Sequence, residues 1–387
     1  MKKILFFITI ILFLTVLWIP LAQMKFEFLP KKDLFGVVTT SKLSELNNES
    51  WFEGIFQENI TNWFQDNFGL RTYLIKTENQ FNWQVFNELS SKTNTRIIRG
   101  LENYLYEYAY IDEYSRRPQK DSKKLELEVQ MLKTLQNKLE KHDIEFLFVI
   151  SPSKASVYPE FIPNNYIFQD RQVLSRSYDM VTKYLDEYGV NYIDGHKILK
   201  DIKEEGDYEV FTKGGVHWNY YGACKVVERI VGRLEGLLNK DMNHVMCDPV
   251  IVDMDAHGTD RDLVELINIW TDEEVSGPTP HPKLDIEKSN NNFIPDILFV
   301  GDSFTHTLLQ VMDGRIYNYR ELLYYFKRRI IFDEGAYSEI EGDVLDWKKN
   351  IEGKDVVVIE NNESHIHDVG FGFIEYALKI LESEMYD

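Results

Sequence analysis

Hydrophobic residues form one long run at the start of the chain and shorter, periodic runs after it. The first run extends from Ile4 to Ala22 and is interrupted only by Thr9, Thr15 and Pro20. A helix over this run would span roughly 28 Å, close to the thickness of a bilayer core. It therefore predicts a membrane-spanning segment within residues 1–23.

The residues around this segment predict its fate and orientation. Two lysines precede the span and no basic cluster follows it, which favours a cytoplasmic N-terminus. A cleaved signal peptide is the alternative, but it usually has a shorter apolar core that ends at a small-x-small site, whereas Pro20-Leu21-Ala22-Gln23 stands here. We expect a retained signal anchor in the cell membrane, crossing it once, with the residues from about 24 onward on the outer face.

Residues 24–120 predict a connector followed by a helical elaboration. Residues 24–50 are turn-rich, and Arg96–Tyr106 reads as a strand, a glycine-containing turn and a second strand. Between Trp51 and Leu89, apolar residues recur at helical spacing, which predicts two helices. These residues are Phe52, Phe56, Ile60, Phe64, Phe68, Leu70, Leu74, Phe81 and Phe86.

Residues 121–387 alternate between amphipathic and continuously apolar segments. The amphipathic segments predict helices over 125–139, 171–188, 220–238, 304–312, 343–350 and 371–384. The apolar segments predict strands over 144–150, 190–193, 297–300, 328–332 and 355–360. This order predicts an α/β domain with a parallel sheet covered on both faces. Residues 240–295 are polar and proline-rich, and we interpret them as an irregular insertion.

Composition excludes several classes of protein. Of the residues, 44% are hydrophobic and 14% aromatic, which excludes a disordered chain. The formal net charge of −20 argues against nucleic-acid binding. Two cysteines, Cys224 and Cys247, are too few for a disulfide framework or a cysteine-rich zinc site. They could pair, although their spacing does not require it, and we expect Cys224 to be a small buried residue in a helix.

The sharpest local signal for chemistry is the sequence Gly301-Asp302-Ser303-Phe304. It directly follows a buried strand and precedes a helix, which places the Ser303 hydroxyl at the sheet edge where ligands bind in open parallel sheets. The backbone N–H of Ser303 at the helix start could donate to an oxyanion. The structural alternative is that Asp302 or Ser303 only caps the helix.

A nucleophilic serine needs a base, and His217 is the best candidate among the nine histidines. It follows Gly214 and Gly215 in a loop just before a helix. His365 and His367 are rival bases. Their H-x-H spacing could suggest a metal pair, but no supporting ligand pattern accompanies it, so we predict neither metal nor cofactor.

Six stretches in the same order resemble one family, the SGNH-hydrolase-like proteins of the AlgJ/AlgX group, which are alginate O-acetyltransferase proteins. The resemblance extends from about Trp51 to the C-terminus. The stretches are Phe68–Arg71, the Gly100 turn with Tyr104 and Tyr106, Ser151–Pro163, His217-Trp218 with Gly222-Ala223, Gly258–Leu263, and Gly301–Phe304.

The resemblance implies an SGNH-like three-layer αβα fold and O-acetylation of an exported or cell-wall polysaccharide. It implies Ser303 as the nucleophile that carries the acetyl group and His217 as its base. It also implies a polysaccharide acceptor and a partner, a multi-pass membrane O-acyltransferase that supplies acetyl groups. A carbohydrate O-acetylesterase with the same residues, or a non-catalytic polysaccharide-binding component, remains an alternative.

One position departs from the family pattern, in which an aspartate stands two residues before the histidine. Here that residue is Gly215. Loss of the orienting aspartate costs a serine protease about 10⁴ in turnover. A backbone carbonyl could orient His217, or a remote carboxylate (Asp260, Asp262 or Glu360) could replace the aspartate. Alternatively, the protein could be catalytically weak and serve as a binding or assembly component.

Three further residues are candidate sugar contacts. Lys154 and Tyr158 follow a predicted buried strand and so project toward the same sheet edge as Ser303, while Trp218 adjoins the base. The alternatives are a solvated lysine for Lys154, a core position for Tyr158, and packing under the loop for Trp218.

Overall fold

The computed structural model describes residues 2–36, 41–43, 45–89, 96–115, 121–167, 175–275, 277–288, 293–332, 336–339 and 350–383. It divides into two compact units, residues 1–95 with 264–272 and residues 96–263 with 273–387. The units depart from the predicted domain boundaries because the 96–107 hairpin belongs to the larger unit, where Leu105 N–H donates to Lys213 O at 2.9 Å.

The smaller unit is helical. Helix α1 is long and apolar enough to cross a membrane, and α3 and α4 correspond to the two helices predicted between residues 51 and 89. Gly69, just before α4, lies against α1, where a Cβ atom would come within 2.2 Å of Pro20 O. The elements are α1 (Lys2–Phe26), α2 (Asn48–Phe52), α3 (Ile55–Asn67), α4 (Arg71–Phe81) and a π-helical turn (Asn82–Phe86).

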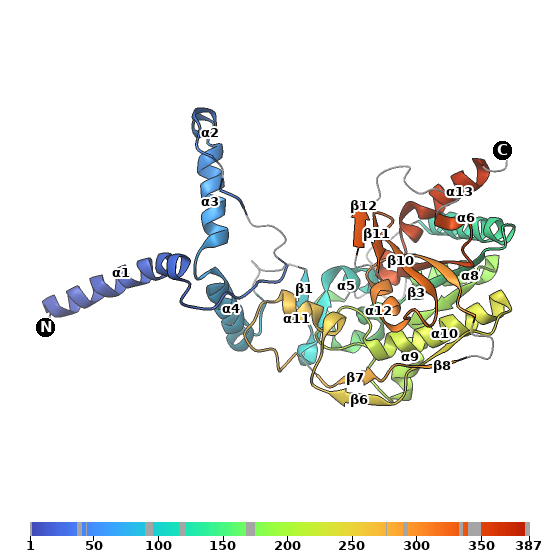
Figure 1. The fold of residues 1–387 in the computed structure, drawn as a ribbon. Coiled ribbons are helices and arrows are strands. Elements are labelled where there is room, and N and C mark those ends of the chain that lie inside the picture. Colours follow the sequence, from blue (N-terminus) through green and yellow to red (C-terminus); the bar gives the residue numbers. More distant parts are fainter. Residues whose placement is uncertain are drawn as a thin grey trace. The chain divides into compact units, whose positions relative to one another are not determined.

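The larger unit is built on a seven-stranded sheet in the order β12-β11-β10-β9-β13-β3-β4 (Figure 1). Strands β10, β9, β13, β3 and β4 run parallel to one another, whereas β11 is antiparallel to both β10 and β12. The sheet is thus mostly parallel, as predicted, with an antiparallel edge. Its strands are β3 (Glu145–Ser151), β4 (Tyr192–Asp194), β9 (Asp296–Gly301), β10 (Asn318–Tyr324), β11 (Arg328–Ile331), β12 (Ala336–Glu339) and β13 (Val356–Asn362).

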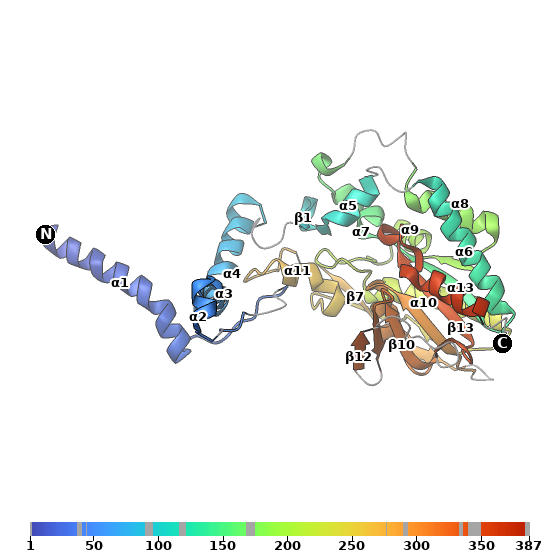
Figure 2. The same ribbon diagram turned by 90° about the horizontal axis from the view of Figure 1, so that it is seen from above.

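Helices cover both faces of this sheet. Helices α6 (Ser122–Glu140), α8 (Ser177–Tyr188) and α13 (Phe373–Ser383) pack on one face around Phe146, Phe148 and Val300 (Figure 2). Helices α9 (Gly195–Glu205), α10 (Tyr220–Leu238) and α12 (Phe304–Val311) contact the sheet from the other side. Because successive side chains of a strand point to opposite faces, continuously apolar strands are what this three-layer arrangement requires.

Several elements differ from the sequence prediction. Strand β10 and helix α9 were not predicted, because β10 includes charged residues and α9 is mostly polar. The predicted helix over 171–188 begins, in the described residues, at Ser177. The predicted helix over 343–350 lies outside the described residues except for residue 350.

Shorter elements complete the larger unit. They are β1 (Ile97–Arg99), β2 (Leu105–Glu107), α5 (Tyr108–Ser115), α7 (Lys154–Val157), β5 (His244–Met246), β6 (Val250–Asp253), β7 (Thr279–Pro282) and β8 (Asp285–Glu287). Helix α11 (Asp262–Leu266) begins in the larger unit, and its residues from Val264 onward belong to the smaller one. The 240–295 segment is therefore more ordered than predicted: β5 pairs with β8, and β6 pairs with β7.

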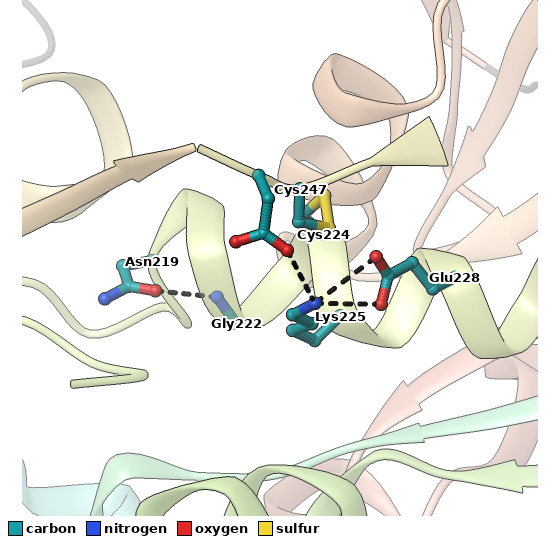
Figure 3. The surroundings of a disulfide bond; sticks show 7 residues. Asn219, Gly222, Cys224, Lys225, Glu228 and Cys247 are labelled. Atoms are coloured by element: carbon teal, nitrogen blue, oxygen red, sulfur yellow. Dashed lines mark hydrogen bonds and ion pairs between the residues drawn. A yellow bond between two sulfur atoms is a disulfide. The ribbon is translucent and has the colours of Figure 1, made fainter. Parts of the chain in front are cut away.

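A disulfide ties this segment to the core. Cys224 in α10 is bonded to Cys247, just after β5. Next to it, Lys225 forms ion pairs with Glu228 and with Asp248 (Figure 3). The expectation that Cys224 is a buried helical residue is confirmed, but its sulfur is in a covalent cross-link.

Candidate active site

Ser303 lies where β9 ends and α12 begins, at the carboxyl edge of the parallel strands. Gly301 is needed at this turn, because a Cβ atom there would meet Thr305 Oγ1 and Glu360 Oε2. Asp302 Oδ1 accepts a hydrogen bond from the N–H of Phe304 at 2.9 Å, so Asp302 caps the helix. The Ser303 side chain makes no capping bond and is available for other chemistry.

His217 contacts that hydroxyl. Its Nε2 lies 2.8 Å from Ser303 Oγ, and its Nδ1 lies 2.5 Å from Asp262 Oδ2. The second carboxylate oxygen of Asp262 accepts from the N–H of Val216 at 2.7 Å. Three side chains are thereby joined in the order Ser303, His217, Asp262, which is the arrangement of a serine, its base and an orienting acid.

The loop that carries His217 is fixed on both sides. Lys154 Nζ donates to the carbonyl oxygens of Thr212 at 3.1 Å, of Lys213 at 2.9 Å and of Gly215. On the other side, Leu263 N–H donates to Gly214 O at 3.0 Å. The imidazole also packs against the Phe304 ring, with centroids 4.7 Å apart. The base is therefore held by backbone and side-chain contacts.

Gly215, the position that departs from the family pattern, has a structural reason. A Cβ atom there would come within 2.6 Å of Thr259 O, 2.8 Å of Thr212 Oγ1 and 3.0 Å of the Asp260 carbonyl carbon. The 258–263 segment occupies the space that an aspartate side chain would need. That same segment supplies Asp262, so among the alternatives left open by the sequence, the geometry favours a remote carboxylate.

The other two carboxylates considered from the sequence do not contact His217. Both oxygens of Asp260 are buried without a hydrogen-bond partner, and burial followed by the charge of Asp262 raises the pKa of Asp260 to about 8. Glu360 accepts from Ser151 Oγ and, at 2.7 Å, from Thr305 Oγ1. Burial, then the charge of Asp302, raises the pKa of Glu360 well above its usual value.

The three candidate sugar contacts are buried, with exposed fractions of 1% for Lys154, 2% for Tyr158 and 0% for Trp218. Lys154 holds the histidine loop, Tyr158 O accepts from Tyr106 Oη at 2.6 Å, and Trp218 Nε1 donates to Phe304 O at 3.2 Å. In this structure they leave almost no surface for a glycan and act as supports of the site, which corrects the expected placement of these side chains.

The rival histidines have other partners. His365 Nδ1 lies 3.2 Å from Asp302 Oδ2, and His367 Nδ1 lies 3.1 Å from Ser364 O. The ring of His306 packs against those of Tyr324 and Phe332. Among the described residues, no group of three or more His, Cys, Asp or Glu side chains is arranged to hold a metal ion.

The sequence stretch from residue 105 to 308 matches the model of the family described as "SGNH hydrolase-like domain, acetyltransferase AlgX". This match covers more than half of the chain, and the chain belongs to that family, the AlgJ/AlgX-like proteins. None of the curated proteins compared with this sequence matches it significantly.

Solved structures with a similar fold include three whose similarity extends over most of this chain. The O-acetyltransferase domain of Pseudomonas putida AlgJ has a TM-score of 0.46 and 16% identity, covering 74% of this chain and 99% of that one. Pseudomonas aeruginosa AlgX has a TM-score of 0.43 and 13% identity, and the match covers 74% of this chain and 70% of that one. Bacillus cereus PatB1 has a TM-score of 0.42 and 13% identity, and the match covers 70% of this chain and 96% of that one.

Proposed function

We propose that this protein is an O-acetyltransferase that adds acetyl groups to an exported or cell-wall polysaccharide through an acetyl-Ser303 intermediate. The observation that carries the proposal is the contact of Ser303 Oγ with His217 Nε2 at 2.8 Å, with Asp262 on the opposite ring nitrogen. The chain belongs to a family whose description names an acetyltransferase, and this membership supports acyl transfer as the reaction.

The first half-reaction would load the serine. Ser303 Oγ attacks the carbonyl carbon of the donor while its proton passes to His217 Nε2. The carbonyl oxygen gains an electron pair, and the backbone N–H of Ser303, just before α12, is suited to stabilise it. The bond to the leaving group then breaks, His217 returns the proton to the leaving group, and acetyl-Ser303 remains.

The second half-reaction would transfer the acetyl group. A sugar hydroxyl attacks the acetyl carbon and gives its proton to His217, and the Ser303 oxygen leaves and takes that proton back. Asp262 supports the imidazole in both steps, because it accepts from Nδ1 and stabilises the cation that forms.

The apolar helix α1 supports a location at the cell membrane, with the larger unit on the outer face. A multi-pass membrane O-acyltransferase is the proposed supplier of acetyl groups. If water rather than sugar were the acceptor, the same triad would make the protein a carbohydrate O-acetylesterase.

The test uses the full chain in detergent with p-nitrophenyl acetate, followed by intact mass measurement. We expect one added acetyl group on Ser303, absent from Ser303→Ala and much slower to form in His217→Ala. His244→Gln is the control, because His244 lies on β5 and is paired with Glu235 of α10. If wild type and Ser303→Ala are equally inert, the proposal is wrong. If acetyl-Ser303 does form, adding oligosaccharides distinguishes transfer, which acetylates the sugar, from hydrolysis, which releases acetate.

A further inference from the structure

A second histidine–aspartate pair lies beside Ser303. The fully buried carboxylate of Asp302, the residue before the serine, contacts His365 Nδ1 through Oδ2 at 3.2 Å. The same oxygen accepts from Asn362 N–H at 2.9 Å. His365 follows β13, the sheet neighbour of β9, so the pair forms where these two strands end.

The contact with Asp302 decides which way the imidazole of His365 points. Nδ1 faces the buried carboxylate, and the side chain is 33% exposed, so the Nε2 side of the ring is the part directed outward. It lines a pocket of about 130 Å³ formed by Tyr325, Lys327, His365, His367, Asp368 and Phe371. A water molecule takes about 30 Å³ in the liquid, so the pocket has room for a small group such as acetyl.

Tyr325 connects this pocket to the nucleophile. Its backbone N–H donates to Gly301 O at 2.8 Å, at the turn that carries Ser303. Its ring is edge-on to His365, with centroids 5.9 Å apart. Burial raises the pKa of Tyr325, while a hydrogen bond with Ser303 acts in the opposite direction. One side chain therefore adjoins both the serine hydroxyl and the second histidine.

The charges around His365 favour its cation. Burial lowers its pKa, but Asp302 outweighs burial through its hydrogen bond and charge, and Glu107 and Asp368 add to that effect, so the pKa lies above the usual value. Lys327 lines the same pocket and acts against the cation. The ring of Tyr110 packs against that of His365, with centroids 6.4 Å apart. Burial raises the pKa of Tyr110, so its hydroxyl stays neutral and adds no charge near His365.

We propose that His365 is a further catalytic residue, whose Nε2–H donates to the acetyl carbonyl oxygen as that oxygen becomes negatively charged. The inference rests on the proposed acyl transfer. His365 forms and breaks no covalent bond and keeps its proton, while the proton of Ser303 passes to His217. A cationic donor at this oxygen stabilises the tetrahedral intermediate of both half-reactions.

Asp302 also explains why the charge of His365 matters. It accepts from Nδ1, so that when His365 loses a proton the remaining one stays on Nδ1. Nε2 then has no hydrogen to donate. The rate of acetyl-Ser303 formation should therefore fall as pH rises through the raised pKa of His365.

The test measures acetyl-Ser303 formation from p-nitrophenyl acetate against pH, with Ser303→Ala subtracted as background. His365→Ala should slow the step by roughly 10²–10³, the usual cost of losing one oxyanion donor. His365→Gln should lose less and lack the alkaline decline, because an amide donor does not titrate. His244→Gln should keep the wild-type profile.

The outcomes separate the two proposals. If wild type forms no acetyl-Ser303, the proposed function fails and this inference fails with it. If wild type reacts but His365→Gln keeps the same alkaline decline, only this inference is overturned. If His365→Ala does not fold, as judged by its thermal unfolding, the profile of His365→Gln still decides.

Discussion

Asp262 Oδ2 lies 2.5 Å from His217 Nδ1 although 45 residues separate them in the chain. The acid comes from the segment that packs along the histidine loop and leaves no room for a side chain at position 215. The carboxylate that contacts Nδ1 is thus supplied by a segment remote in sequence from the histidine loop and not by position 215.

Asp262→Asn should lower the rate of acetyl-Ser303 formation by about 10²–10⁴, because the imidazole loses its orienting charge. Single-turnover kinetics would measure this. Asp260→Asn is the matched control: its carboxyl is buried two residues away without contacting His217, and it should change the rate by no more than a few-fold. Equal losses in both variants would contradict the role of Asp262.

Gly215→Asp should not rescue Asp262→Asn, although it recreates the family pattern. The new side chain would meet Thr259 O and Thr212 Oγ1, and overpacking of this kind costs roughly 1–3 kcal/mol. We expect a lower free energy of unfolding in denaturant and no gain in rate. A double variant as active as wild type would show that the loop adapts.

Lys154→Met should destabilise the protein and slow acyl transfer together. It removes the Nζ donor from the carbonyls of Thr212 and Gly215, whereas Lys213 O keeps the N–H of Leu105, and this loss costs at least about 2 kcal/mol. Urea unfolding and the acetylation rate would measure the two effects. Lys133→Met, which removes an exposed bond to Gly189 O, should leave both nearly unchanged.

Stability should fall in acid through Glu363. This buried carboxylate contacts His196 Nδ1 at 2.9 Å and accepts from Ser153 N–H at 2.7 Å. Burial raises the pKa of Glu363, but the charge of His196 and its hydrogen bond outweigh burial and lower that pKa from 4.5 to about 2. A lowered pKa gives stability that is present above about pH 4.5 and lost as pH falls toward 2, here about 3 kcal/mol. In Glu363→Gln, the pH dependence of unfolding in this window should be shallower.

Removing the disulfide with Cys224→Ser and Cys247→Ser should cost about 3 kcal/mol, because the cross-link closes a loop of 23 residues. The triad residues are not part of the bond, so the folded variant should acetylate Ser303 at close to the wild-type rate. A large loss of rate at temperatures where the variant is folded would mean that the cross-link also positions the site.

Local patterns in the sequence predicted much of the fold and part of the site. Continuous apolar runs predicted β3, β9 and β13, and the patterns around Ser303 and His217 singled out two of the three side chains that the structure brings together. Strand β10 escaped prediction because Arg320 and Glu321 interrupt its apolar pattern. The choice of Asp262 over Asp260 and Glu360 depends on tertiary contacts such as the bond from Val216 N–H, and one sequence carries no local signal of these.

Strand β13 lies between β9 and β3 in the sheet, although it follows both in the chain. It pairs in parallel with each of them, so residues 356–362 complete the centre of the sheet after the strands on either side have been made. Ser303 and His217 are synthesised well before this strand. A growing polypeptide therefore contains both side chains before it contains the strand that pairs with β9, the strand that leads to Ser303.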